Sequence, residues 1–141
     1  MAPASGLWFM PDSNVFFDVV LQDQAWAGWS SAVLAASGEV GAVVINQVIF
    51  AEVSSVFQRI EDAREMLANA GILTDDLPWD AAFLAGQAFR AYRRRGGVRT
   101  TTLPDFFIGA HALLRGYTLI TRDPRRYRTY FPNLKLVAPE P

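Results

Sequence analysis

Leu7-Trp8-Phe9-Met10-Pro11-Asp12 is a short apolar run that ends in a carboxylate. Such a run is typical of a strand in a parallel sheet whose two faces are both covered. The stretch Tyr117-Thr118-Leu119-Ile120-Thr121-Arg122-Asp123 repeats this pattern near the C-terminus. In open α/β sheets, ligands bind beyond the carboxyl ends of the strands. We therefore predict strands at residues 7–11 and 117–121, with their acidic ends at one edge of a sheet.

Two further acids lie within apolar surroundings. Glu52 interrupts the apolar residues 48–53, and Asp105 precedes Phe106-Phe107-Ile108. A buried carboxylate without a partner is costly, and two like charges ~4 Å apart repel by about 4 kcal/mol at an effective dielectric constant near 20. A divalent cation removes this repulsion. The four acids therefore predict one shared cation pocket, made of Asp12, Glu52, Asp105 and Asp123.

The ligand types indicate the cation and the chemistry. Oxygen ligands without cysteine or clustered histidine favour Mg²⁺ or Mn²⁺ over zinc. Such an ion polarises a phosphoryl oxygen and activates a bound water, which matches phosphodiester hydrolysis. Each acid also has a local structural interpretation. Asp12 can form a turn before Ser13-Asn14, Asp105 can favour the first turn of a helix, and Asp123 before Pro124 is typical of a turn.

The remaining pattern predicts the fold class. Short apolar runs indicate strands at residues 41–45, 72–73 and 134–137. Helical spacing and helix-end residues predict helices at residues 23–36, 47–60, 61–70, 78–95 and 104–115, and a helical turn at 125–130. Because strands alternate with helices, we predict an α/β protein with a three-layer α/β/α sandwich and a short, mainly parallel central sheet. Residues 1–141 are expected to form a single domain.

The composition excludes several kinds of site. The chain has no cysteine, which excludes a disulfide framework, a thiolate zinc site and a cysteine nucleophile. His111 is the only histidine, so a ribonuclease site with two histidines is excluded, and we predict that His111 is packed or hydrogen-bonded. No apolar run reaches the ~18 residues of a membrane span, and no signal-peptide pattern is present. We expect a cytoplasmic protein that does not contact a membrane.

The basic residues are concentrated in the second half of the chain. Residues 1–80 hold eleven acids and two arginines, whereas residues 81–141 hold ten arginines, one lysine and three acids. This division indicates contact with a polyanion or an acidic partner, or else two halves that compensate each other. Arginine matches phosphate geometry well. The candidates for RNA contact are Arg93, Arg94, Arg95, Arg99, Arg122, Arg125 and Arg126.

Aromatic residues leave two interpretations open. Tyr127 and Tyr130 could stack on bases, belong to the core or contact a partner protein. Trp26 and Trp29 could be core residues or line a groove for a partner segment.

Four motifs resemble those of the PIN-domain family, and most closely those of the VapC ribonuclease toxins of prokaryotic toxin–antitoxin pairs. The resemblance covers residues 7–138. It rests on Pro11-Asp12-Ser13-Asn14-Val15, on Val43-Val44-Ile45-Asn46 through Ala51-Glu52-Val53, on Pro104-Asp105-Phe106-Phe107-Ile108-Gly109-Ala110-His111-Ala112-Leu113, and on Leu119-Ile120-Thr121-Arg122-Asp123. Three positions depart from the family pattern. Asp123 stands where many relatives have Asn, Ser13 replaces the more frequent Thr, and His111 stands where a small residue is common.

The resemblance implies an Mg²⁺- or Mn²⁺-dependent endoribonuclease that forms a homodimer and is inhibited by a VapB-like antitoxin. It implies that Asp12, Glu52 and Asp105 hold the metal and that Asp123 completes the acidic pocket. Ser13, Asn14 and Thr121 would orient the carboxylates or bound waters. The alternative is a catalytically inactive PIN-like module that binds RNA or protein. A phosphotransferase with an aspartate nucleophile fits poorly, because no Asp-x-Asp pair is present and the sole lysine is Lys135.

Overall fold

A central parallel sheet organises the molecule. The computed structural model describes residues 6–98 and 102–141, and within them five strands pair in the order β3-β2-β1-β4-β5. Every pairing is parallel, including β1 with β2 and β1 with β4. The strands are β1 Trp8–Pro11, β2 Ala42–Ile45, β3 Leu73–Thr74, β4 Thr118–Ile120 and β5 Leu136–Val137. The sheet is short, as the apolar runs predict.

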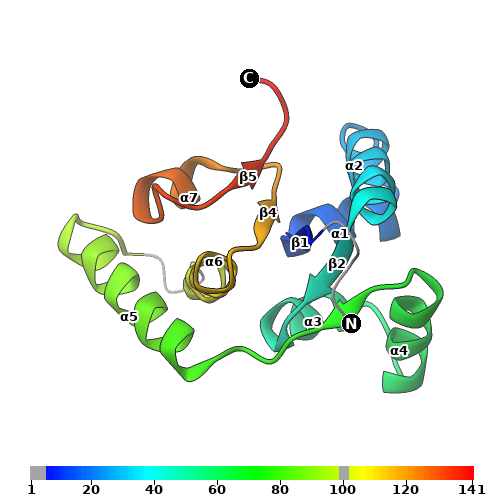
Figure 1. The fold of residues 1–141 in the computed structure, drawn as a ribbon, viewed down its shortest axis with the longest axis horizontal. Coiled ribbons are helices and arrows are strands. Elements are labelled where there is room, and N and C mark those ends of the chain that lie inside the picture. The colour runs from blue at the N-terminus through cyan, green and yellow to red at the C-terminus, as the bar shows by residue number, and fades with distance from the viewer. Residues whose placement is uncertain (1–5, 99–101) are drawn as a thin grey trace.

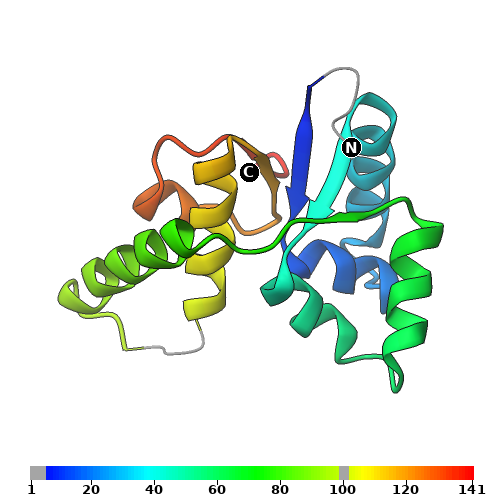
Figure 2. The same ribbon diagram turned by 60° about the horizontal axis from the view of Figure 1, so that its bottom comes forward.

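Helices cover the sheet, which confirms the predicted α/β/α class. The helices in the described residues are α1 Ser13–Val20, α2 Ala27–Val40, α3 Gln47–Ser54, α4 Ile60–Asn69, α5 Trp79–Arg94, α6 Leu103–Arg115 and α7 Arg125–Tyr130. Figure 1 shows α1 to α4 grouped around β1 and β2, whereas α6 and α7 lie beside β4 and β5. Figure 2 shows the segment after β3 crossing from the first group to α5 in the second. The two groups meet along the β1–β4 pairing.

Three predicted helix boundaries are wrong, and one helix was missed. The sequence indicated a turn after Asp12, but residues 13–20 form α1, which Asp12 caps by accepting a hydrogen bond from the Ser13 N–H. The helix predicted at 23–36 begins at Ala27 and continues to Val40. The helix predicted at 47–60 ends at Ser54. There the Ser55 hydroxyl donates to the Glu52 carbonyl, a side-chain contact that competes with continued helix.

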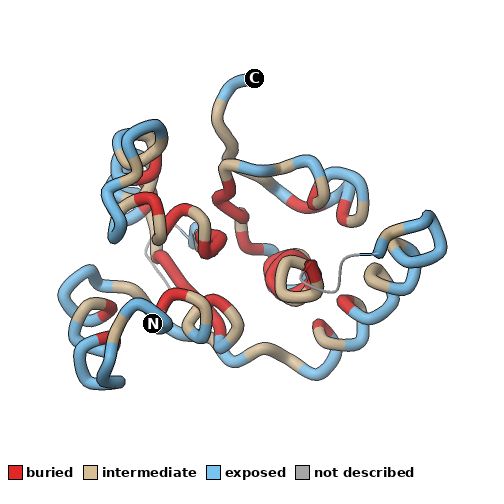
Figure 3. The backbone as a smooth tube through the Cα atoms, turned by 180° about the vertical axis from the view of Figure 1, so that it is seen from behind, coloured by how far each residue is buried: buried red, intermediate tan, exposed pale blue. Residues whose placement is uncertain are grey.

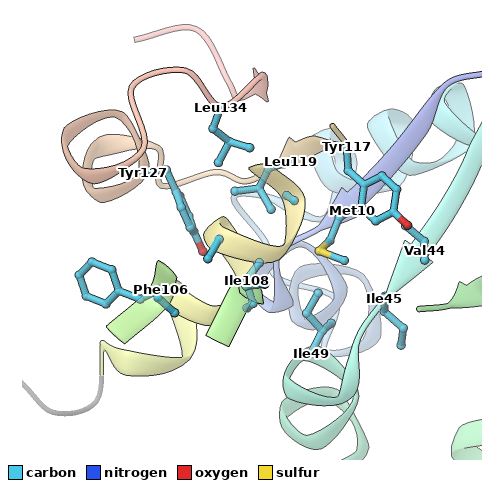
Figure 4. Packing of buried hydrophobic residues seen from close by; sticks show 14 of the residues in the cluster. Met10, Val44, Ile45, Ile49, Phe106, Ile108, Tyr117, Leu119, Tyr127 and Leu134 are labelled. Carbon is cyan, nitrogen blue, oxygen red and sulfur yellow. The ribbon is translucent and has the colours of Figure 1, made fainter. Parts of the chain in front are cut away.

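The core surrounds the sheet and includes residues of helices on both sides of it, among them Phe16 of α1, Ile49 of α3 and Ile108 of α6. Figure 3 shows buried backbone at the strands and along α6, whereas the outer helices are largely exposed. Figure 4 shows Met10, Ile49 and Leu119 directed into this core from three different elements. A side chain at Gly109 of α6 would come within 2.7 Å of the Phe131 ring and 3.0 Å of the Tyr127 ring. The absence of a side chain there lets the α7 region pack tightly against α6.

No helix in the described part of the chain is long and apolar enough to cross a membrane.

Candidate active site

The four acids predicted to share a pocket all lie on elements that meet at the carboxyl edge of the sheet. Asp12 follows β1 directly, and its backbone N–H donates to the Ile120 carbonyl at the end of β4 (2.7 Å). Asp105 lies in the first turn of α6, and Glu52 lies on α3, which begins just after β2. Asp123 follows β4, and its backbone N–H donates to the Thr121 hydroxyl (3.1 Å). Parallel pairing of β1 and β4 places their ends side by side.

Asp12 is the most buried of the four acids, with 5% of its surface exposed. One oxygen, Oδ1, accepts from the Ser13 N–H (2.8 Å). The other, Oδ2, accepts from the Thr121 hydroxyl (3.0 Å), the Tyr127 hydroxyl (2.9 Å) and, at 3.5 Å, Asn14 Nδ2. Burial, and then the charge of Asp105, raise the pKa of Asp12 to about 7, although these hydrogen bonds oppose the shift. The hydrogen-bond donors alone therefore do not offset the free-energy cost of burying an ionised Asp12 carboxylate.

Ser13 connects Asp12 to Glu52. Its backbone N–H binds Asp12, and its hydroxyl donates to Glu52 Oε1 (2.5 Å). Asn14 also donates from Nδ2 to the Thr121 hydroxyl (3.3 Å). The three polar residues predicted to orient the carboxylates or bound waters thus contact the acidic side chains or one another. They are Ser13, Asn14 and Thr121.

Asp105 faces a cation. Arg126 Nη1 donates to Asp105 Oδ2 at 2.6 Å. Burial raises the pKa of Asp105, Arg126 lowers it, and the charges of Glu52 and Asp123 raise it, so that the pKa lies above its usual value. The acids are therefore close enough for their charges to influence one another. Asp123 is the outermost of them, because its side chain is exposed.

The donor set fits a hard divalent cation, but the side chains are not arranged as a complete set of ligands. Within residues 6–98 and 102–141, no group of three His, Cys, Asp or Glu side chains is placed to hold a metal ion. The Asp105 carboxylate binds Arg126 and the Glu52 carboxylate binds Ser13. The chemistry nevertheless suits Mg²⁺ or Mn²⁺, because the donors are carboxylate oxygens and the buried Asn14 Oδ1 has no hydrogen-bond partner.

The predicted RNA-binding arginines have different partners. Arg95, Arg125 and Arg126 line a groove of about 490 Å³ beside Asp123. The Arg95 guanidinium lies over the Tyr130 ring, 5.7 Å from its centroid. Arg93 and Arg94 are exposed at the end of α5. Arg99 lies outside the described residues.

Arg122 forms an ion pair with a buried carboxylate. Its Nε donates to both carboxylate oxygens of Asp18 (2.8 and 3.0 Å), and Asp18 is 2% exposed on α1. Ser30 of α2 donates to the same carboxylate (2.8 Å), and Trp26 lies under the guanidinium at 5.8 Å. Arg122, which follows β4, therefore links the end of this strand to α1 and α2. No local pattern in the sequence predicts this pair, since Asp18 and Arg122 are far apart in the chain.

Tyr127 was also not recognised as a site residue. It is 2% exposed and donates to Asp12, so it is unavailable for stacking on a base. Its own pKa is raised well above the usual value, by burial and by the negative charges of Asp12, Asp105 and Glu52. Of the interpretations of this residue, the core position is the one that its burial confirms. Tyr130 packs edge-to-face against Phe106 in the neighbouring aromatic cluster.

A second polar cluster surrounds His111, which is buried as predicted. Asn46 Oδ1 accepts from the Ile49 N–H, so its Nδ2 must donate to His111 Nδ1 (3.0 Å). Nε2 then carries the proton and donates to Asp75 Oδ2 (2.9 Å). Burial lowers the pKa of His111 more than Asp75 raises it, so the ring is neutral at pH 7. This histidine connects the ends of β2 and β3 to α6.

Comparisons with known proteins agree with this architecture. The family model of the PIN domain matches residues 9–132. Solved structures similar to the chain include VapBC2 from Rickettsia felis bound to a DNA fragment of its promoter, with 17% identity, a TM-score of 0.71, and coverage of 95% of this chain and 100% of that chain. DNA-bound VapBC from Salmonella typhimurium is 18% identical with a TM-score of 0.66, covering 94% of this chain and 98% of that one. At these identities the likeness shows the fold alone. No curated protein matches the chain in sequence.

Proposed function

The chain belongs to the PIN-domain family, and we propose that it is a VapC-type toxin, an endoribonuclease that hydrolyses RNA phosphodiester bonds with Mg²⁺ or Mn²⁺. The observation that carries the proposal is the acidic pocket itself. Asp12 is buried with a pKa raised to about 7, next to a second carboxylate, Asp105, whose pKa is also raised. Repulsion between carboxylates contributes no stability to a fold. Neighbouring acids with perturbed pKa values are typical of functional sites.

Each residue has a task in this proposal. Asp12, Glu52 and Asp105 would hold the ion, and Asp123 would complete the pocket from its exposed rim. Bound there, the ion would polarise a phosphoryl oxygen and lower the pKa of a water. Tyr127, Thr121 and Ser13 fix the carboxylates of Asp12 and Glu52 through the hydrogen bonds described above. No side chain is required as the nucleophile.

The groove beside Asp123 is proposed as the path of the RNA backbone. Arg95, Arg125 and Arg126 line it together with Thr129 and Tyr130. Arg93 and Arg94 would extend this basic surface from the end of α5, and Arg99 is proposed as a further contact. Binding through phosphates would weaken as salt rises. Arg122 contributes less to this proposal, since its guanidinium already binds Asp18.

We also propose two protein partners and a cytoplasmic location. The similar solved structures are toxin–antitoxin complexes by their descriptions, which supports a VapB-like antitoxin here. A homodimer is supported by α5, where Trp79 and Phe83, four residues apart, are 91% and 71% exposed. Large exposed apolar side chains on one helix face are typical of an interface. Light scattering on the purified chain would test the dimer.

A second candidate is a PIN-like module that binds RNA or protein without cleaving it. The contact between Arg126 and Asp105 favours this candidate, because the arginine already supplies a cation to the pocket. The two candidates differ in one result, namely cleavage that depends on a divalent ion.

The deciding experiment incubates end-labelled RNA with the purified chain and Mg²⁺ or Mn²⁺, with and without EDTA. We expect cleavage that EDTA abolishes. Asp12→Asn should reduce the rate by roughly 100-fold or more, since even groups that only support metal ligands contribute about 10- to 100-fold. Asp62→Asn is the matched control, because Asp62 is exposed on α4. RNA binding without cleavage by the wild type would favour the inactive module.

A further inference from the structure

Arg126 occupies the metal pocket from the side of α7. Its Nη1 lies 2.6 Å from Asp105 Oδ2, and its guanidinium lies over the Tyr92 ring at 6.0 Å. The side chains of Arg126 and Asp105 are 27% and 31% exposed, so the pair lies at the boundary between the pocket and solvent. A contact at such a boundary is easier to break than a buried one, because water can solvate both separated charges.

One arginine faces several carboxylates here. Asp12, Glu52, Asp105 and Asp123 lie on elements that meet at the carboxyl edge of the sheet, and within the described residues the contact between Arg126 and Asp105 is the one ion pair made to any of them. A divalent ion carries twice the charge of a guanidinium and would offset more of the negative charge of these acids.

A comparison with Arg122 shows what a structural ion pair looks like in the same molecule. Arg122 contacts both oxygens of Asp18, and Asp18 is 2% exposed and also bound by Ser30. Arg126 contacts one oxygen of Asp105 through one nitrogen. Its hydrogen bond is the single one made to the Asp105 carboxylate within the described residues. The Arg126 contact is therefore made by fewer hydrogen bonds and to a more exposed carboxylate than the Arg122 contact.

The groove beside Asp123 offers the Arg126 side chain a second position. Arg126 lines the groove of about 490 Å³ that also contains Arg95 and Arg125. A guanidinium that leaves Asp105 would remain in this basic groove, where a phosphate can replace the carboxylate as its partner.

Resting on the proposed function, we propose that Arg126 is an internal counter-ion of the metal pocket. It holds Asp105 while no ion is bound and gives way when a divalent cation binds. Its guanidinium is then available to an RNA phosphate in the groove. Arg126 is thus a positioning residue whose contact with Asp105 competes directly with the metal.

Metal affinity gives the test, with isothermal titration calorimetry of Mn²⁺ as a readout that needs no RNA. Arg126→Met keeps an apolar stem against Tyr92 and removes the competing charge. We expect it to bind Mn²⁺ about two- to fivefold more tightly than wild type, the range that corresponds to loss of a partly exposed ion pair. Mn²⁺ should also raise the melting temperature of this variant more than that of the wild type.

The matched control is Arg125→Met. Arg125 is exposed on the same helix and lines the same groove, and it makes no ion pair with Asp105. Loss of its charge should change Mn²⁺ affinity by less than about twofold, since exposed charges are screened. In an Asp105→Asn background, Arg126→Met should no longer increase the affinity. If Arg126→Met does not fold, Arg126→Lys gives the same comparison, with a smaller gain expected from its weaker contact.

The outcomes separate the two proposals. Tighter Mn²⁺ binding by Arg126→Met but not by Arg125→Met supports the counter-ion role. Equal or weaker binding by Arg126→Met, or an equal gain in Arg125→Met, overturns that role while the metal-dependent function stands. If neither the wild type nor any variant binds Mn²⁺, both proposals fail together.

Discussion

Asp12 and Asp75 lie in two polar clusters at the same sheet, and their pKa values are shifted in opposite directions. Asp75 Oδ2 accepts from the Tyr117 hydroxyl (2.7 Å), His111 Nε2 (2.9 Å) and Arg115 Nε (3.1 Å). Burial raises the pKa of Asp75, but these donors outweigh it, so that the pKa is lowered. Asp12 also accepts several hydrogen bonds, yet its pKa is raised to about 7 by burial and by Asp105.

One cluster stabilises the fold, whereas the other retains capacity for a ligand. The donors around Asp75 satisfy its charge, and the cluster joins β3, α6 and β4, so its role is structural. The acidic pocket keeps carboxylates that repel one another, a cost that a bound cation would remove. Functional sites often retain such local instability.

The largest expected effect is the pH dependence of stability that Asp12 creates in metal-free protein. Its pKa is about 7 in the folded state and near 3.8 in the unfolded chain, so protonated Asp12 favours folding. Stability should therefore fall as the pH rises from about 4 to 7, by up to about 4 kcal/mol. Asp12→Asn should remove most of this slope in urea unfolding measured between about pH 5 and pH 8.

The same measurement has an internal check. Asp105, Glu52 and Arg126 also carry charge in this pocket. Asp62 lies outside it, so Asp62→Asn must retain the wild-type slope of stability against pH. Mn²⁺ should restore stability to the wild type at about pH 8 and have little effect on Asp12→Asn. Equal slopes in wild type and Asp12→Asn would contradict the comparison.

The second effect is the loss of the compensated cluster. Asp75→Ala should lower the free energy of unfolding by about 2–3 kcal/mol, because it leaves the buried His111 Nε2 and the Tyr117 hydroxyl without their acceptor. The lowered pKa of Asp75 means that its stabilisation is complete above its ordinary pKa, near 3.8, and is lost below it. The difference from wild type should thus stay constant between about pH 5 and pH 8, unlike that of Asp12→Asn. Asp76→Ala, the exposed neighbour, should change stability by less than about 0.5 kcal/mol.

The smallest effect concerns a single hydroxyl. Tyr127→Phe removes the hydrogen bond to Asp12 Oδ2 and leaves the ring in place, so it should cost about 1 kcal/mol near pH 8. Tyr130→Phe is the control, since the Tyr130 hydroxyl makes no hydrogen bond within the described residues. Thermal or urea unfolding measures both. A loss in Tyr130→Phe as large as that in Tyr127→Phe would mean that the hydroxyl bound to Asp12 contributes nothing specific.

Much of the fold was predictable from short-range patterns. The runs 7–11 and 117–121 became β1 and β4, and the acids at their ends lie at adjacent strand ends. These positions follow from local rules, because an apolar run without alternation needs cover on both faces and parallel strands share one carboxyl edge. Helix α1 was not predicted. Ser13-Asn14 is typical of a turn and Val15-Phe16-Phe17 favours a strand, whereas the Asp12 cap and the burial of Val15 and Phe16 favour the helix.

The local order of apolar runs and acids in the sequence therefore predicts a layered sheet with carboxylates at one edge. The local order does not predict which side chains contact those carboxylates. Arg126 with Asp105, Tyr127 with Asp12 and Arg122 with Asp18 are partners separated by 21, 115 and 104 positions. Such pairs arise only when the packing of α7 on α6 and of β4 on β1 brings distant segments together. Whether a carboxylate is compensated depends on those contacts, because burial and neighbouring charge are properties of the folded molecule.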